Sequence, residues 1–305
     1  MSEPQQGLSY DEILALARTA EQAGFETYFR SDHYASFPGE AGLPTTDAWA
    51  TLAGLARELP RIGLGTLVSP VTFRLPGNLA KVVATVAEMS GGRVELGLGA
   101  GWNELEHRQL GLPFAATGQR FDMLEEQLAI VHGLWTEPAG WSYEGRHWQI
   151  SVLRHQPGHA WAAGAADDQV RVAQYADEIN ISSAEPPKVA AAFERVRAAC
   201  GRLDRDPDSV TYSAMVGVLV GRDEADLERR IGDLLAAFGR EDDAGREWLA
   251  ERRERWIFGT PDEARRRVDS YAAAGVERIM LQDFLPRDLE MVRLLGDIFG
   301  LRSAA

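Results

Sequence analysis

The stretch Gly91-Gly92-Arg93-Val94-Glu95-Leu96-Gly97-Leu98-Gly99-Ala100-Gly101-Trp102-Asn103-Glu104-Leu105-Glu106-His107 decides the fold. Apolar residues alternate from Val94 to Leu98, which predicts a β-strand. Three glycines then fall within five residues, and a helix-like segment follows to Leu110. A strand that ends in glycines and opens a helix presents backbone N–H groups to an anion. A tight turn without a ligand fits the same glycines, so both interpretations stay open.

Two common nucleotide-binding fingerprints fail in this stretch. The dinucleotide pattern requires a third glycine where Trp102 stands, and no acidic residue closes the next strand at the required distance. A P-loop requires a final Gly-Lys-Ser/Thr, which the sequence lacks. What remains is a strand-to-helix turn suited to an anion, with the bulky Trp102 at its rim.

The overall composition is that of an ordinary soluble globular protein. The 305 residues are 45% hydrophobic and 26% charged, and no apolar run approaches the ~20 residues that span a bilayer. The sequence begins without a signal-peptide pattern, and Cys200 is its single cysteine, so we expect a cytoplasmic protein without disulfides. A net charge of −14 argues against nucleic acid or an anionic membrane as a partner.

Strand and helix patterns alternate from end to end, which indicates an α/β fold with a parallel sheet. We expect seven strands, each followed by a helix, at residues 25–30, 61–69, 94–98, 160–164, 178–182, 210–220 and 278–282. A TIM (β/α)8 barrel requires one more strand before Ser9, and residues 1–8 are too rich in Gln, Pro and Glu to supply a good one. The predicted fold is therefore a TIM-type barrel that lacks, or poorly forms, its first strand. Either the sequence starts late or the barrel closes imperfectly.

No linker, repeat or low-complexity tract interrupts this alternation, so we expect residues 1–305 to form a single domain. It carries two insertions: an aromatic hairpin near 138–150 and a very charged helical segment near 239–256. Catalytic residues of such barrels lie on the loops after the carboxyl ends of the strands. The candidate loops are residues 31–34, 69–74, 100–106, 164–166 and 182–184.

Four motifs in order suggest a known family. They are Ser31-Asp32-His33-Tyr34, the segment from Gly65 to Arg74, Ser90-Gly91-Gly92-Arg93 with Gly97 to Trp102, and Tyr175-Ala176-Asp177-Glu178-Ile179-Asn180. Together they resemble the luciferase-like monooxygenase superfamily, and specifically its coenzyme F420-dependent oxidoreductases. The resemblance covers nearly the whole chain, from Gly7 to about Gly300.

The resemblance implies a barrel that binds a flavin or deazaflavin at its carboxyl face and passes hydride between that ring and an organic substrate. It implies that Asp32 and His33 lie near the ring, with His33 as the proton donor or acceptor. It also implies a wall behind the ring, where the family often has a bulge with a non-proline cis peptide, at Leu67, Val68 and Ser69.

The phosphate tail of the cofactor is the other element that the resemblance locates. Backbone N–H groups of Ala100 and Gly101 are implied to hold it. Ala163, Gly164 and Ala165 match the family's Gly-Gly turn, which closes over the same tail.

The sequence also departs from the family in three places. The first strand is missing, and residues 153–159 are shorter than the proline-rich approach of relatives. Asp167 and Asp168 stand where relatives often place basic residues, and two carboxylates there repel a phosphate or glutamate tail.

His33 has a chemical case of its own, because a neighbouring carboxylate such as Asp32 can fix the tautomer of an imidazole for proton transfer. A histidine bonded to a neighbouring loop is the structural alternative. Arg30 and Arg74 stand near strand ends and can pair with cofactor phosphate or act as internal salt-bridge partners. Glu106 and His107 can line the substrate mouth, but we expect them to be an exposed pair on a helix.

Other residues point to no additional chemistry. His147, His155 and His159 lack a metal-ligand spacing, so no metal is expected. The aromatic side chains can roof an apolar substrate cleft or pack a hairpin onto the barrel; they are Trp102, Trp141, Tyr143 and Trp148. No nucleophile motif is present, which favours chemistry supplied by a cofactor.

Three functional hypotheses follow. The first is a coenzyme F420-dependent oxidoreductase acting on a small organic substrate, with His33 handling the proton. The second keeps the fold but uses reduced FMN and oxygen as a monooxygenase. The third is a non-catalytic or defective paralogue, unstable because one strand is missing. Relatives often dimerise, so a homodimer is possible.

Overall fold

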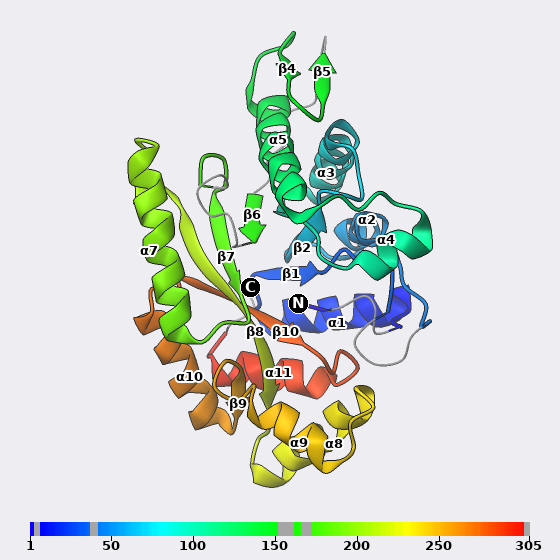
Figure 1. Ribbon diagram of the computed structural model, residues 1–305. Coiled ribbons are helices and arrows are strands. Elements are labelled where there is room, and N and C mark those ends of the chain that lie inside the picture. The colour runs from blue at the N-terminus through cyan, green and yellow to red at the C-terminus, as the bar shows by residue number, and fades with distance from the viewer. Residues whose placement is uncertain (3–6, 37–41, 152–161, 166–172, 302–305) are drawn as a thin grey trace.

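The computed structural model describes residues 1–2, 7–36, 42–151, 162–165 and 173–301 (Figure 1). Its main sheet is parallel, with neighbouring strands in the order β1-β2-β3-β6-β7-β8-β10. The strands are β1 (Thr27–Arg30), β2 (Gly63–Pro70), β3 (Val94–Gly99), β6 (Ala162–Ala165), β7 (Glu178–Ser182), β8 (Thr211–Val220) and β10 (Arg278–Asp283). These are the seven strands that the sequence predicts.

Helices surround the sheet on its outer side (Figure 1). They are α1 (Tyr10–Gln22), α2 (Ala48–Glu58), α3 (Pro76–Ser90), α4 (Glu104–Leu110), α5 (Thr117–Thr136), α7 (Pro186–Arg202), α8 (Glu224–Ala237), α9 (Asp243–Ala250), α10 (Pro261–Ala273) and α11 (Leu289–Ile298). Their apolar stripes pack on outward-facing strand residues such as Tyr28, Leu64 and Leu96, forming the main core. A smaller apolar cluster of Phe29, Leu67 and Met280 is separate from it.

The place of the first barrel strand is held by two residues. Ser2 forms an isolated parallel bridge both to Arg30 of β1 and to Asp283 of β10. Its N–H donates to Phe29 O at 3.0 Å, and Ser31 N–H donates to Ser2 O at 3.2 Å. On the other side, Asp283 N–H donates to Met1 O at 3.0 Å. Within the described residues, the first strand is thus reduced to a bridge between β1 and β10.

The two expected insertions differ in character. Residues 138–150 contain the predicted hairpin, in which β4 (Ser142–Glu144) pairs antiparallel with β5 (Gln149–Ser151). The buried Glu126 of α5 fixes this hairpin, because its carboxylate accepts backbone N–H groups at 2.8 to 3.2 Å from Arg146, His147 and Trp148. The charged segment near 239–256 contains only the short α9, and β9 (Ile257–Gly259) then pairs with β8, which the sequence did not predict.

No helix among the residues described here combines the length and the apolar composition needed to cross a membrane.

We expect acid to weaken the fold partly through Glu12 of α1. Its carboxylate accepts from Arg287 Nε at 2.6 Å and from Ser9 N–H at 2.8 Å, and these two contacts, Arg287 first, lower its pKa to about 2. Because folding lowers this pKa from 4.5, the stabilisation is complete above about pH 4.5 and disappears as the pH falls towards 2. Glu12→Gln should lose less than about 1 kcal/mol at pH 7, since the pair is exposed.

Urea titrations of both proteins at pH 7 and pH 3 measure this difference. The gap in unfolding free energy between wild type and Glu12→Gln should be smaller at pH 3. A gap that stays constant between the two pH values would contradict the assignment.

Candidate active site

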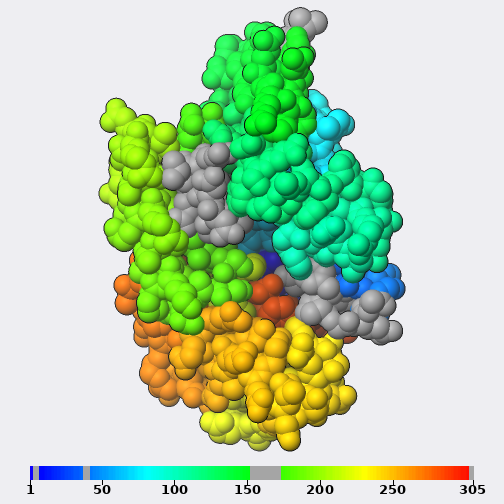
Figure 2. Space-filling model, viewed as in Figure 1, coloured from blue at the N-terminus to red at the C-terminus, as the bar shows by residue number. Residues whose placement is uncertain are grey.

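Three segments that the sequence motifs mark follow the carboxyl ends of β1, β2 and β3. They are residues 31–34, 71–74 and 100–106, and their side chains contact one another. In the space-filling view the molecule is hollowed at its centre, between the teal surface at α4 and the yellow-to-orange surface of α8 and α9 (Figure 2). The helix α4, which follows the glycine turn after β3, borders this hollow.

Asp32 and His33 are adjacent in the chain but hold different partners. Asp32 is buried, accepts a hydrogen bond from Ser69 Oγ at 2.7 Å, and forms an ion pair with Arg74. His33 Nδ1–H donates to Glu106 Oε1 at 2.8 Å. The carboxylate that holds the imidazole is therefore Glu106 rather than the expected Asp32. The partners of Asp32 come from β2 and the loop after it, whereas the partner of His33 comes from α4, and this separates the two groups.

Arg74 joins Asp32 to a second carboxylate. Its Nη2 lies 2.5 Å from Asp47 Oδ2 and donates to Tyr34 OH at 2.9 Å. Burial disfavours the charge of Arg74, but Asp32 first and Asp47 next outweigh this and raise its pKa. Burial also raises the pKa of the Asp32 carboxyl, which Arg74 opposes. These contacts match the internal salt-bridge alternative for Arg74.

Arg30, the other arginine near a strand end, is also held by contacts within the protein. Arg30 is buried and donates from Nη1 to Thr46 Oγ1 at 3.0 Å and from Nη2 to Thr46 O at 2.9 Å. These bonds hold the chain before α2 against the end of β1.

The prediction for Glu106 and His107 is wrong. The expected exposed pair of Glu106 and His107 is in fact buried, with 1% exposure for each residue. Glu106 Oε2 accepts Tyr34 N–H at 3.0 Å while Oε1 holds His33, so both oxygens are used. His107 accepts from Thr72 and donates to Asn103 O at 2.7 Å. Helix α4 therefore turns both side chains inward, against the loops that follow β1 and β2.

The glycine turn lies directly beside His33. The Trp102 ring meets the His33 imidazole edge-on, with 5.7 Å between ring centroids, and Trp102 remains 64% exposed. Gly101 has φ +78°, and a Cβ there would lie 3.2 Å from Pro70 Cβ and from Thr72 Oγ1. Ala100 is half-buried. The predicted tail-binding turn and the predicted proton-transfer residue thus share one end of the barrel.

The wall at Leu67, Val68 and Ser69 contains the expected backbone irregularity. The Leu67–Val68 peptide is cis, and the register between β2 and β3 shifts between Thr66 and Ser69. A Cβ on Gly97 would come within 2.2 Å of Thr66 O, so glycine is required where β3 passes this shift. Leu67 packs with Phe29 and Met280 in the smaller apolar cluster, against which Val68 also packs.

Ala163, Gly164 and Ala165 lie in β6, between β3 and β7, so their backbone belongs to the same sheet. Gly164 pairs with Leu98 on one side and Ile179 on the other. Asp167 and Asp168, together with residues 153–159, lie outside the described residues. His155 and His159 fall in that segment.

The hairpin aromatics fit the packing alternative. Trp141, Tyr143 and Trp148 are partly buried against the main core, and a Cβ on Gly133 of α5 would come within 2.2 Å of Trp141. In the ranges that the structure describes, no group of three or more His, Cys, Asp or Glu side chains is arranged to hold a metal ion.

We expect Gly101→Ala to lower the free energy of unfolding by about 1–2 kcal/mol, because its positive φ disfavours any Cβ. Gly118→Ala in α5 is the matched control, since a Cβ there meets nothing within 4 Å and alanine favours helix. Thermal unfolding of both variants measures the difference. Equal midpoints for the two variants would show that the turn tolerates a side chain.

The fold and site together define a TIM-type barrel protein in which a half-buried histidine pairs with a buried carboxylate at the carboxyl ends of the strands. The family model described as luciferase-like monooxygenase matches residues 1–280. The chain therefore belongs to the luciferase-like monooxygenase family, as its motifs indicate.

Among curated relatives, an uncharacterized protein of Mycobacterium tuberculosis (strain ATCC 25618 / H37Rv) is 34% identical over 53% of this chain and 64% of its own length. The F420-dependent glucose-6-phosphate dehydrogenase of Microbacterium testaceum is 35% identical over 46% of this chain and 41% of its own length. The matched part of the chain thus spans less than two thirds of these relatives.

Solved structures resemble the whole chain. An F420-dependent secondary alcohol dehydrogenase, in complex with an F420-acetone adduct, has a TM-score of 0.81 at 16% identity and covers 98% of this chain and 96% of its own. The EDTA monooxygenase of Chelativorans sp. BNC1 has a TM-score of 0.77 at 18% identity, with 97% and 89% covered. At these identities the likeness establishes the fold.

Proposed function

We propose that this protein is a coenzyme F420-dependent oxidoreductase that transfers hydride between the deazaflavin and a small organic substrate. The observation that carries the proposal is the His33–Glu106 pair, 2.8 Å apart, whose imidazole contacts Trp102 beside the Gly101 turn. A group for proton transfer and a turn open to an anionic tail then serve one bound molecule. The 35% identity to an F420-dependent glucose-6-phosphate dehydrogenase supports the same cofactor.

The residues present fit such a cofactor. Leu67 and Val68 offer an apolar wall for a flat ring, next to Phe29 and Met280. At Gly101 a Cβ would fill the space against Pro70 and Thr72, so the glycine keeps the turn open to a phosphate tail held at Ala100 and Gly101. When bound, F420 accepts or supplies a hydride at C5 of its ring.

The chain's own residues would handle the proton. For an alcohol substrate, the carbon loses a hydride and the hydroxyl loses its proton to His33, and the reverse reaction returns both to a ketone. Glu106 holds Nδ1–H, which fixes the tautomer and makes Nε2 the nitrogen that gains or loses the proton. The relatives and neighbours named as alcohol or sugar dehydrogenases support this substrate class.

Separate titrations with F420 and with FMN test the proposal, with binding followed by quenching of cofactor fluorescence. We expect saturable F420 binding that weakens in Gly101→Val. Tight FMN binding without F420 binding would favour the second candidate, an FMN-dependent monooxygenase, which the likeness to the EDTA monooxygenase supports. Failure to bind either cofactor would favour the non-catalytic paralogue.

A further inference from the structure

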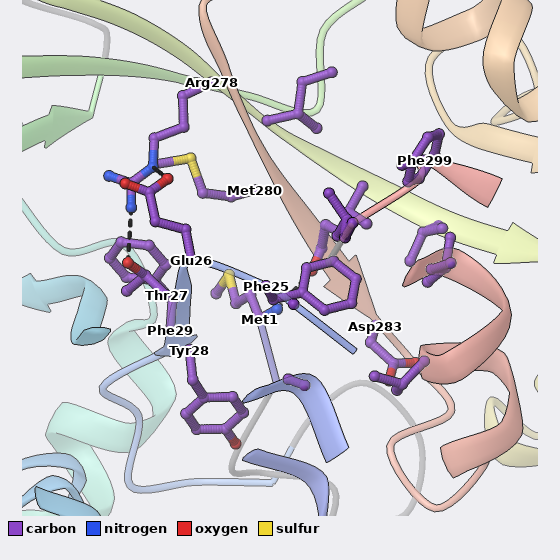
Figure 3. Close-up of a pocket in the computed structure, with 18 of the residues that line it drawn as sticks. Met1, Phe25, Glu26, Thr27, Tyr28, Phe29, Arg278, Met280, Asp283 and Phe299 are labelled. Atoms are coloured by element: carbon purple, nitrogen blue, oxygen red, sulfur yellow. Dashed lines mark hydrogen bonds and ion pairs between the residues drawn. The ribbon is translucent and has the colours of Figure 1, made fainter. Parts of the chain in front are cut away.

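The smaller apolar cluster shows which positions of β8 and β10 face the inside of the barrel. It contains Phe29, Leu67 and Met280, and Met215 of β8 packs against it. Figure 3 shows Phe29 and Met280 on one side of the cavity at the place of the first barrel strand, and Asp283 on the other. Alternate residues of a strand face opposite sides of a sheet, so Met215 and Met280 mark the inward-facing positions.

A tryptophan lies against the inner side of β8, near the carboxyl end of that strand. Gly217 comes two residues after Met215 and therefore also faces inward. A Cβ on Gly217 would come within 2.4 Å of the Trp256 ring, so the indole occupies that position. Trp256 stacks on Phe284, the first residue after β10, with 5.2 Å between ring centroids and 19° between the planes. Both rings thus lie at the mouth of the barrel.

Two further rings extend this stacked pair. Phe238, which follows α8, meets Phe284 edge-on at 5.5 Å, and Trp248 of α9 meets Trp256 edge-on at 6.2 Å. We call Phe238, Trp248, Trp256 and Phe284 the aromatic cluster. The charged insertion near 239–256 thereby supplies two of its four rings. Trp256 is 4% exposed, whereas the other three are half-buried and keep part of their surface exposed.

The aromatic cluster and His33 lie at the same end of the barrel. Ser2 bridges both Arg30, the last residue of β1, and Asp283, the last residue of β10, so these two strand ends are level. His33 follows the first strand end by three residues, and Phe284 follows the second directly. Because neighbouring strands lie about 4.8 Å apart, β1 and β10 are separated here by about 10 Å. In Figure 2, orange-red surface, the colour of β10 and the residues after it, lines the hollow beside α4.

We propose that the substrate carries an apolar ring beside its reacting carbon, as an aryl or cycloalkyl secondary alcohol or ketone does, and that this ring packs on Phe284. The inference rests on the proposed function, because it takes His33 as the group that handles the hydroxyl proton. Aromatic rings favour stacked or edge-on contacts, so a substrate ring would extend the contacts already present in the cluster. Phenyl rings offer no hydrogen bonds, so a hydroxyl-rich or strongly charged ligand would lose hydration there without replacement.

A flexible alkyl chain fits the aromatic cluster less well than a ring. It supplies apolar area but no flat face, and ordering its rotatable bonds opposes binding. Two methyl ketones of eight carbons separate these cases: acetophenone carries one ring, and 2-octanone carries a linear chain.

The test measures binding of acetone, acetophenone and 2-octanone by calorimetry to the whole protein saturated with F420. Acetophenone should bind at least about 30-fold more tightly than acetone, because of its added apolar area, and at least about threefold more tightly than 2-octanone. Phe284→Leu should weaken acetophenone binding at least about fivefold and leave acetone binding unchanged. Phe299→Leu is the matched control, since Phe299 is also half-buried but lines the cavity of Figure 3, and it should change neither.

Equal affinities for acetophenone and 2-octanone overturn the proposal, as does an equal loss of acetophenone binding in the two variants. Tighter binding of glucose 6-phosphate than of acetophenone overturns it as well. F420 binding, followed in the same samples by fluorescence quenching, keeps this result apart from the proposed function. If F420 does not bind, the oxidoreductase proposal fails, and the effect of Phe284→Leu on acetophenone binding to the free protein decides whether the cluster binds rings.

Discussion

Replacing Arg278 by methionine lowers the free energy of unfolding by about 3–5 kcal/mol at pH 7, the cost of breaking a buried ion pair from one side. The Arg278 guanidinium lies 2.6 Å from Glu95 and 3.0 Å from Glu178, and it donates to Thr27 Oγ1 at 2.9 Å. Three strands, β1, β3 and β7, are thereby tied to β10 across the barrel. The variant leaves both carboxylates without this cation, and the Glu178 side chain is only 1% exposed.

The pH dependence of this loss distinguishes lost charge pairing from lost packing. Burial raises the pKa of Glu178, and Arg278 opposes that effect, so the variant raises the pKa further. A carboxyl whose pKa is higher in the folded state than in the unfolded state loses stability as the pH rises. The deficit of Arg278→Met should therefore be larger at pH 8 than at pH 5, as measured by urea unfolding.

An exposed ion pair provides the control. Arg293 of α11 lies 2.6 Å from Glu290, but both side chains are about half exposed. Arg293→Met should cost less than about 1 kcal/mol at either pH. If Arg278→Met matches this control, the cluster at the base of the barrel does not hold the strands together.

The sequence predicts the strands because their signals are local. Alternating or continuous apolar runs mark all seven. Counting them leaves the place of the first barrel strand, which among the described residues is held only by the Ser2 bridges to β1 and β10. Short strands are harder to predict. The strand β9 has only three residues, Ile257–Gly259, and it forms by pairing with the edge of β8. Three residues are too few to show an alternating apolar pattern in the sequence.

The site is only partly predictable for a similar reason. Residue position in a motif locates His33 and Gly101, but not which carboxylate holds the imidazole. Asp32 is adjacent in sequence, yet it is drawn to Arg74 and Ser69, 42 and 37 residues away. Glu106 reaches His33 across 73 residues because α4 folds back over the loop after β1. Which carboxylate pairs with the imidazole depends on how the loops pack against one another, and a local sequence pattern does not predict that packing.

His33→Asn should lower kcat by about 10²–10⁴, the usual contribution of a positioned acid or base, while F420 affinity stays within about twofold. The measurement is turnover with F420 once a substrate is found, alongside the fluorescence titration. In His33→Gly, added imidazole should restore part of the turnover, which a merely structural role would not allow. Turnover above half of wild type in His33→Asn would remove His33 from the proposed chemistry.

Glu106 should act through His33, as a positioning residue. Glutamine offers one acceptor oxygen where Glu106 offers two, so either His33 Nδ1–H or Tyr34 N–H loses its partner in Glu106→Gln. We expect kcat to fall on the order of 100-fold with KM little changed. Because the two residues act as a unit, Glu106→Gln should add almost nothing in the His33→Asn background. Fully additive losses would mean that Glu106 supports the loop after β1 independently of the imidazole.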